Sequence, residues 1–156
     1  MQKITPCLWF NNNGEEAINF YASIFNDCKI TNKKYYGEAG PGPKGSLLAA
    51  TFQMEGQEFM VLNGGPIFQF SPAISFFVKC STQEEVDNFW NKLSAEGQEQ
   101  QCGWVTDKFG VSWQIVPSIL GELLDDPDEI KSQKVMYAML QMKKIIISDL
   151  KAAYEK

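Results

Sequence analysis

Apolar and polar residues alternate along 111–116, directly after a tight turn expected at 107–110, where Gly110 supplies the free backbone angle. Because a strand has a period of two, residues 111, 113 and 115 share one face and residues 112, 114 and 116 the other. The first set is Val111, Trp113 and Ile115; the second is Ser112, Gln114 and Val116. The pattern predicts a strand whose apolar face is covered by a helix. We expect the second face, centred on the amide of Gln114, to be concave and to bind a ligand.

The same plan occurs earlier in the chain, which indicates an internal repeat. Segment 56–63 aligns with 110–117, and 15–21 resembles 84–90. Each of these helical segments follows a predicted strand, Ile4–Phe10 in one case and Ala73–Lys79 in the other. We therefore predict an α+β fold of two βαβββ modules, 1–66 and 67–117, with curved, mostly antiparallel sheets around a cup and helices on the outside. Residues 118–156 are expected to form a C-terminal helical extension of the same domain.

Local sequence signals predict where further helices and strands begin and end. Strands are expected at 28–36, 46–54 and 57–63, and a helix with the buried stripe Ala17, Phe20, Tyr21 and Ile24 begins after Asn13 or Gly14. The glycine-rich segment 37–45 suggests either a phosphate-binding loop or a hairpin connection; prolines 41 and 43 lack N–H donors, which favours the hairpin. The pattern at 81–84 is typical of a capping box that opens the second helix.

The last forty residues depart from the repeat. The Asp126–Pro127 pair indicates a helix start, and Val135, Ala138, Met139 and Met142 share one helical face. A last short helix is expected over Ile145–Tyr154. This extension is predicted to pack across the other half or on a second subunit. Segment 64–72, which joins the modules, carries Phe68 and Phe70 and is expected to pack down on the fold rather than act as a free linker.

Composition narrows the function. The 156 residues are 44% hydrophobic, yet no run approaches the roughly 20 apolar residues of a membrane span, and the N-terminus lacks a signal-peptide core, so a cytoplasmic protein is expected. The net charge of −5 without a basic stripe argues against nucleic acid as a partner. The four cysteines form no Cys-x-x-Cys pair and are expected to be free. There is no histidine, which excludes His-based triads, His general bases and His metal ligands.

Several motifs resemble a known family. They are 8–10 (Leu-Trp-Phe), 16–21, 62–66, 73–76, 102–104, 107–117 and 138–140. The two-module plan resembles the vicinal oxygen chelate superfamily of glyoxalases, bleomycin-resistance proteins and extradiol dioxygenases, and the motifs resemble its PhnB-like family, often called demethylubiquinone methyltransferases. The resemblance implies the fold and a homodimer. It does not carry over methyl transfer, because no strand, Gly-rich turn and helix cradle for an adenosyl cofactor is present.

Metal-using members of that superfamily place one ligand on the first and last strand of each half. In this sequence those positions fall near Thr5, Met60, Ala73 and Gln114. Divalent metals in such sites prefer His, Asp or Glu, and Glu58 is the nearest carboxylate. We therefore expect no metal and no cofactor, and no metal-dependent glyoxalase or dioxygenase chemistry.

The concave face is therefore predicted to be a small-molecule site, lined by apolar and aromatic side chains with a few polar groups. Its expected ligand-binding residues are Thr5, Cys7, Trp9, Glu58, Met60, Leu62, Ser75, Phe77, Trp104, Ser112 and Gln114. Three hypotheses stay open: a metal-free binding protein, an enzyme of unknown reaction that uses Glu58, Cys7 or Lys108, and a structural or regulatory dimer with a vestigial pocket. The cup is formed within one chain or between two subunits.

Overall fold

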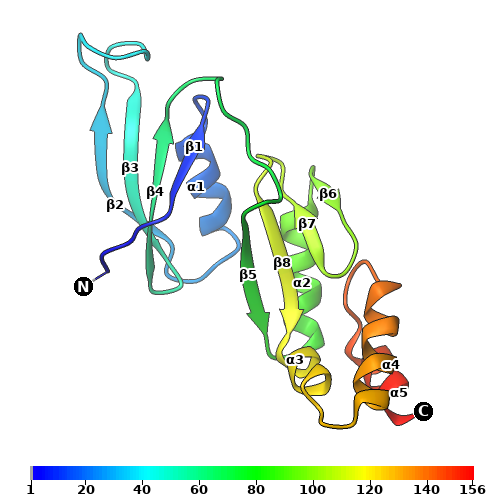
Figure 1. Ribbon diagram of the computed structural model, residues 1–156. Coiled ribbons are helices and arrows are strands. Elements are labelled where there is room, and N and C mark those ends of the chain that lie inside the picture. The colour runs from blue at the N-terminus through cyan, green and yellow to red at the C-terminus, as the bar shows by residue number, and fades with distance from the viewer. Residues whose placement is uncertain (1) are drawn as a thin grey trace. The chain divides into compact units, whose positions relative to one another are not determined.

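The computed structural model describes residues 2–156, and the chain divides after Phe70 into two compact units (Figure 1). Over this described range each unit contains one four-stranded sheet. No helix in the same range is both long and apolar enough to cross a membrane.

The first unit has the predicted order of strand, helix and three strands. Its elements are β1 (Cys7–Phe10), α1 (Gly14–Ala22), β2 (Lys29–Tyr35), β3 (Leu47–Met54) and β4 (Gln57–Asn63). The strands lie in the order β1-β4-β3-β2, with β1 parallel to β4 and the other pairs antiparallel. Segment 36–46 joins β2 to β3 as a hairpin, since the backbone N–H of Tyr36 donates to the carbonyl of Ser46. This confirms the hairpin interpretation of the glycine-rich loop.

Helix α1 covers one face of this sheet (Figure 1). Ala17 and Tyr21 of the predicted stripe are buried, and Ile18, which the stripe omitted, is buried beside them. They meet the inward residues of the strands, among them Phe52 and Val61, which are fully buried. Along β4 burial alternates as a strand requires, so that Glu58, Met60 and Leu62 lie on the face away from α1 and are only half-buried.

Asn63, the last residue of β4, joins three segments of the first unit. Its Oδ1 accepts from the backbone N–H of Gly14 at 2.9 Å, and its Nδ2 donates to the carbonyl of Leu47 at 3.3 Å. Its own carbonyl accepts from the hydroxyl of Tyr36. Helix α1 begins where the sequence predicted, but the side chain of Asn13 makes no capping bond. The first free N–H of the helix is satisfied by Asn63 instead.

The segment after β4 packs on the first unit, as predicted. The rings of Phe68 and Trp9 meet edge to face with centroids 4.9 Å apart, and Phe70 meets Phe10 in the same way at 5.1 Å. The indole Nε1 of Trp9 donates to the carbonyl of Gly65 at 2.9 Å. These contacts fix residues 64–70 against β1.

The second unit repeats the plan. Its elements are β5 (Ser75–Cys80), α2 (Gln83–Ser94), β6 (Gln98–Glu99), β7 (Trp104–Thr106) and β8 (Ser112–Pro117), with strand order β5-β8-β7-β6 and β5 parallel to β8. Helix α2 covers the face that carries Trp113 and Ile115, which are 2% and 0% exposed (Figure 1). Gln114 points to the other face. The alternation predicted for this strand is confirmed.

The turn at 107–110 is built around Asp107, which is only 2% exposed. Its Oδ1 accepts from the backbone N–H groups of Phe109 and Val111 at 2.8 and 3.0 Å, and its Oδ2 accepts from the indole of Trp113 at 2.9 Å. Gly110 has a φ of 93°, which confirms the expected role of glycine at this position. One carboxylate thus fixes both the turn and the central tryptophan of β8.

Residues 118–156 form α3 (Ser118–Leu124), α4 (Glu129–Leu140) and α5 (Ile147–Glu155), all within the second unit. We call this segment the tail. Its apolar core contains Leu120, Val135, Ile145 and Leu150 and meets the sheet at Val116. The predicted Met139 and Met142 pack against this cluster. The face of Val135, Met139 and Met142 therefore packs within the tail's own half of the chain, and the prediction that it packs across the other half or on a second subunit is wrong.

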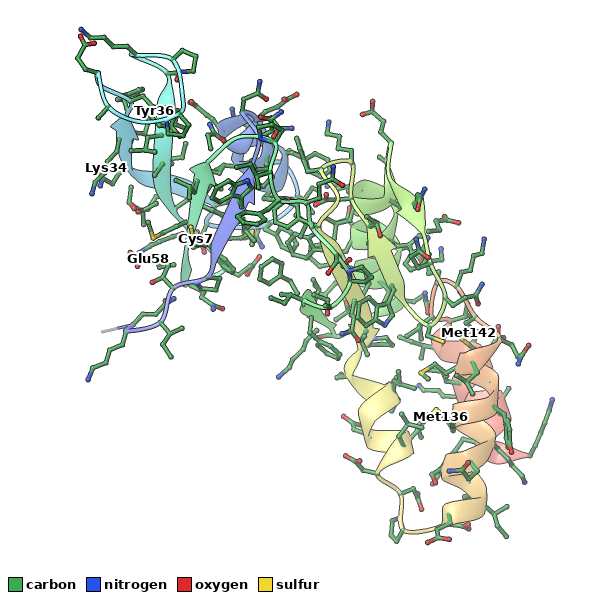
Figure 2. All side chains as sticks on the ribbon, turned by 45° about the horizontal axis from the view of Figure 1, so that its top comes forward. Cys7, Lys34, Tyr36, Glu58, Met136 and Met142 are labelled. Atoms are coloured by element: carbon green, nitrogen blue, oxygen red, sulfur yellow. The ribbon has the colours of Figure 1, made fainter. Side chains whose placement is uncertain are left out.

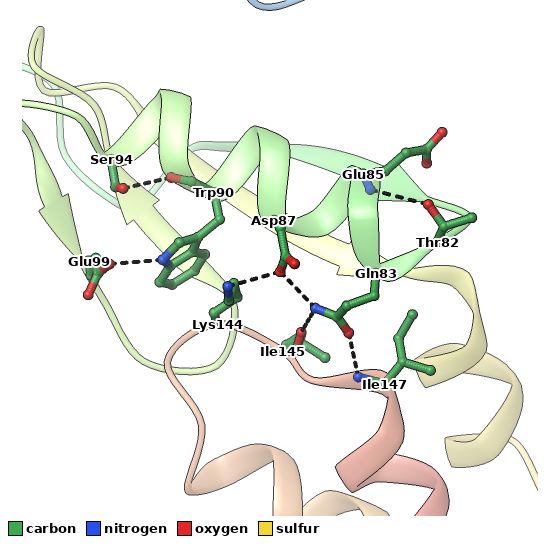
Figure 3. Close-up of polar contacts among 10 residues, drawn as sticks. All are labelled: Thr82, Gln83, Glu85, Asp87, Trp90, Ser94, Glu99, Lys144, Ile145 and Ile147. Atoms are coloured by element: carbon green, nitrogen blue, oxygen red, sulfur yellow. Dashed lines mark hydrogen bonds and ion pairs between the residues drawn. The ribbon is translucent and has the colours of Figure 1, made fainter.

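Polar contacts also attach the tail to α2 (Figure 3), and backbone hydrogen bonds attach it to the loop before β7. The amide of Gln83 donates to the carbonyl of Ile145 at 3.1 Å and accepts from the N–H of Ile147 at 2.7 Å. Lys144 forms an ion pair with Asp87 at 2.9 Å. The N–H groups of residues 102 and 103 donate to the carbonyls of 142 and 143, both at 2.8 Å.

Several predicted bounds need correction. The strands expected at 4–10 and 73–79 are β1 and β5, which begin at Cys7 and Ser75. The second helix is capped by Thr82, whose hydroxyl accepts from the N–H of Glu85, so the capping box lies one residue later than predicted. Helix α4 begins at Glu129 with Asp128 as its cap, not at Pro127, and α3 was not expected.

Candidate functional site

The face of the second sheet away from α2 carries a row of three side chains on adjacent strands. Strand register places Phe77 of β5 beside Gln114 of β8, and Gln114 beside Trp104 of β7. Neighbouring strands lie about 4.8 Å apart, so the two aromatic side chains stand roughly 10 Å from each other with the amide between them. Phe77 is 54% exposed although it is a large apolar side chain. The two aromatic side chains thus flank the Gln114 amide on one face of the sheet.

A groove of about 500 Å³ lies over this row. We call it the β8 groove; it is lined by Phe77, Lys79, Cys102, Trp104, Gln114, Val116, Pro117, Ser118, Leu120, Gly121, Leu124 and Met139. Its volume falls within the roughly 300–1,000 Å³ typical of small-molecule sites. The lining is mainly apolar and aromatic, with Gln114 as a central polar group.

Gln114 is held in place by a neighbouring strand. Its Nε2 donates to the hydroxyl of Ser75 on β5 at 2.9 Å. This bond orients the amide and leaves Oε1 as an acceptor directed away from the bond to Ser75. The amide is therefore suited to a ligand that donates a hydrogen bond, such as a hydroxyl or an N–H group.

The remaining predicted site residues, apart from Ser112 on β8, lie on the first unit. Thr5 precedes β1, and its hydroxyl donates to the Glu58 carboxylate at 3.1 Å. Cys7 pairs in register with Met60, and Trp9 with Leu62, so these four share the face away from α1. Figure 2 shows Cys7 and Glu58 on the neighbouring strands β1 and β4. Ser112 is buried in β8 and pairs in register with Ser75.

The three catalytic candidates do not form one centre within a unit. Burial raises the pKa of the Cys7 thiol, whereas a nucleophilic cysteine needs a lowered one. Glu58 shares the first unit with Cys7, but Lys108 lies in the second, in the turn before β8. The Lys108 ammonium is 3.5 Å from Glu96 and 5.6 Å from the ring of Phe109, and it does not line the β8 groove.

The donor atoms at the superfamily's ligand positions do not fit a divalent metal. Strand register matches Thr5 with Ser75, so the position assigned to Ala73, which precedes β5, belongs to Ser75 instead. The first unit then supplies a hydroxyl and the Met60 thioether, and the second a hydroxyl and the Gln114 amide. Such donors are poor substitutes for the carboxylate and imidazole that these metals prefer. Across residues 2–156, no three Cys, Asp or Glu side chains gather as a potential metal site.

Sequence reasoning missed part of the groove and two other hollows. Lys79 shares strand parity with Phe77 and was detectable from the sequence, but the contribution of α3 and α4 was not, because nothing in the pattern places the tail at the end of β8. A hollow of about 500 Å³ beyond Trp104 is lined by Pro72, Gln98, Gln100, Gln101, Thr106 and Ser112. On the first unit, a hollow of about 450 Å³ lies beneath the 41–43 loop beside Tyr36, Glu15 and Asn63.

Solved structures share this architecture. The PhnB protein of Bacillus cereus is 40% identical, with a TM-score of 0.68 over 75% of this chain and 100% of its own. A Pseudomonas aeruginosa protein is 22% identical, with a TM-score of 0.62 over 75% of this chain and 98% of its own. A variant of the Listeria monocytogenes fosfomycin resistance protein FosX, solved with Mn(II) and 1S,2S-dihydroxypropylphosphonic acid, is 16% identical, with a TM-score of 0.52 over 72% of this chain and 90% of its own. No curated protein matches the sequence significantly.

Two sheets, each built as strand, helix and three strands, define the glyoxalase-like class of folds. The family model for 3-demethylubiquinone-9 3-methyltransferase matches residues 2–116. The chain belongs to that family, which confirms the resemblance seen in the sequence. The match ends before the tail.

Proposed function

We propose that the protein is a metal-free binding protein for a flat, apolar small molecule, and that the β8 groove is its binding site. The observation that carries the proposal is the row of Phe77, Gln114 and Trp104 within one groove. A planar ring placed between the two aromatic side chains would lie directly above the amide. Its hydroxyl or N–H group would donate to the Oε1 of Gln114.

The charge of the groove further restricts the class of ligand that it can bind. Among the described residues that line the groove, Lys79 has the one charged side chain, and none is an aspartate or a glutamate. A cationic ligand is therefore disfavoured, and a neutral or anionic aromatic is favoured, although the chain as a whole carries a net charge of −5. Phenols are the simplest compounds with a flat ring, no positive charge and one hydrogen-bond donor.

The absence of a metal requirement rests on the donor atoms at the ligand positions. Thr5, Ser75, Met60 and Gln114 supply two hydroxyls, a thioether and an amide, which is a poor set for a divalent cation. Mn(II) in the FosX structure belongs to a chain of the same fold but only 16% identity. Elemental analysis of protein prepared without chelator should find less than roughly a tenth of an equivalent of metal. A stoichiometric metal would overturn this part of the proposal.

Paired ligands test the site directly. Phenol can donate its hydroxyl hydrogen, whereas anisole carries a methyl group in its place and cannot donate. Phenol should therefore bind the native protein several times more tightly than anisole does. Replacing Gln114 with leucine (Gln114→Leu) should remove this preference, a loss of about 1 kcal/mol or roughly fivefold in Kd for phenol. Titration of ¹⁵N-labelled protein followed by NMR measures both constants, and the largest shifts are expected at 77, 104 and 114.

Gln53→Leu is the matched control, since Gln53 is an exposed glutamine on β3 of the first unit. It should leave the preference for phenol intact. Phenol-induced shifts spread evenly over the surface, or an unchanged preference in Gln114→Leu, would contradict the proposal. An enzyme of the same fold remains the alternative, and turnover of a bound phenol during the titration would favour it.

A further inference from the structure

One end of the β8 groove is built by the tail rather than by the repeated fold. Leu120, Gly121 and Leu124 of α3 line it together with Met139 of α4. The family model matches residues 2–116, so these residues lie beyond the segment that the model matches. This end of the groove is therefore formed by the tail and not by the two-module fold.

The wall is fixed in place by the rest of the second unit. Backbone N–H groups of Cys102 and Gly103 donate to the tail at 2.8 Å, and the tail core packs on Val116. Gly103 has a φ of 85°, and a Cβ there would lie 2.8 Å from the Cδ1 of Ile145. Glycine at this position allows the tail to approach closely, so the wall is a formed surface before any ligand arrives.

On the face of the second sheet away from α2, the lining residues change from polar to apolar toward the tail. Beyond Trp104, away from the tail, the neighbouring hollow is lined by amides and hydroxyls, including Gln98, Gln100 and Thr106. At the other end, Val116 leads to the leucines of α3 and to Met139. A ligand ring above Gln114 would thus have polar surroundings on one side and apolar surroundings on the tail side.

We infer that the tail forms a subsite for an apolar substituent of the ligand, so that the preferred ligand is an aromatic ring with an aliphatic chain on the side opposite its hydrogen-bond donor. This inference rests on the proposed function, because it takes the ring position above Gln114 as given. The donor faces the amide, the ring lies between Phe77 and Trp104, and the chain runs along β8 to the leucines.

Gly121 offers a precise way to fill this subsite. It lines the groove, its φ lies outside the left-handed region, and a Cβ added there meets no atom within 4 Å. Gly121→Leu should therefore place a side chain in the groove without displacing the tail, and leucine favours the helix over glycine. An unchanged or raised Tm would show that the variant folds.

The experiment measures the Kd of phenol, 4-ethylphenol, 4-butylphenol and 4-hexylphenol by NMR titration or calorimetry. In the native protein the affinity should rise with chain length by up to about fourfold per buried methylene. In Gly121→Leu the gain with chain length should be lost, so that the Kd values of phenol and 4-hexylphenol differ by no more than about twofold. Gly37→Leu is the matched control, because Gly37 also has open space around its Cβ but lies in the first unit.

The outcomes separate the two levels of the proposal. If phenol itself does not bind, the proposed function fails. If phenol binds but the longer phenols gain nothing, or Gly121→Leu keeps the full gain, the tail subsite is wrong while the proposed function stands. A loss in Gly37→Leu equal to that in Gly121→Leu would also overturn the subsite, because it would show that the effect does not arise in the groove.

Discussion

Single side chains of this protein hold several elements at once, and Asp107 is the clearest case. It is buried and accepts three hydrogen bonds, two from the backbone of its own turn and one from the indole of Trp113. Removing the carboxylate leaves three donors without their partner in a site that is closed to water. Each unsatisfied buried donor costs about 1–3 kcal/mol.

We predict that Asp107→Ala lowers the free energy of unfolding by roughly 3 kcal/mol or more. Urea denaturation followed by far-UV circular dichroism measures the change. Asp125→Ala is the control, since Asp125 is an exposed carboxylate after α3, and its effect should stay within about 0.5 kcal/mol. A loss below about 1 kcal/mol in Asp107→Ala would show that the turn does not depend on the carboxylate.

At the scale of elements, the attachment of the tail to α2 depends on an ionised carboxylate. The pKa of Asp87 lies below the usual range of an aspartate, first because Gln83 donates a hydrogen bond to the carboxylate and then because the Lys144 ammonium pairs with it. Since the folded pKa is the lower one, the stabilising contribution is complete above the unfolded pKa and is lost as pH falls through the folded pKa.

The pH dependence of Asp87→Asn should therefore differ from that of the native protein. Above about pH 5 the variant should be less stable by a constant, small amount, because Asp87 is a surface group. As pH falls below the unfolded pKa the gap should narrow, and it should close once the pH lies below the lowered folded pKa, where the native carboxylate is protonated. Thermal denaturation from pH 3 to pH 7 measures the gap; a gap that widens in acid would contradict the assignment.

Elements and strand faces were predictable because both follow from local periodicity. The alternation at 111–116 identified the buried face of β8 with Trp113, and the repeat identified both modules. The pairing of Gln114 with Phe77 and Trp104 was not predictable, because strand register depends on contacts between segments far apart in the sequence. The bonds that Gln83 and Asn63 make over long separations, 62 and 49 residues, were missed for the same reason.

Helix starts were harder to predict than helix faces. The segment 81–84 has the composition of a capping box, but Thr82 also has a glutamate three residues later, and sequence alone does not separate the two registers. The Asp126–Pro127 pair was a plausible start that the chain does not use, since Asp128 supplies the cap for α4. Competing caps one or two residues apart differ by energies that depend on the surrounding fold.

For the whole molecule, we propose a homodimer, as the sequence and the family suggested. Each sheet has edge strands, and α4 presents the exposed apolar side chains of Ile130, Tyr137 and Leu140. Edges and apolar faces of this kind favour association, and most soluble oligomers are two-fold. We expect an interface above roughly 1,000 Å².

Light scattering at micromolar concentration decides the oligomeric state. The expected mass is about 35 kDa, twice the 17.6 kDa of one chain. Tyr137→Lys would place a charge on the exposed face of α4 and should lower the dimer fraction if α4 forms the interface, while an unchanged mass would point to the sheet edges. A mass of 17.6 kDa that does not change on concentrating would mean a monomer and would exclude a cup shared between subunits.

The bond between Gly14 and Asn63 also sets an order of events during synthesis. The first N–H of α1 receives its partner from a residue 49 positions later in the chain. At about 5–20 residues per second, the ribosome needs roughly 2 to 10 seconds to reach Asn63 after Gly14. Helix and coil interconvert within about a microsecond, so α1 has time to form and melt on the order of a million times before this partner exists. On the growing chain, the start of the first helix becomes permanent only once the last strand of its own sheet has been made.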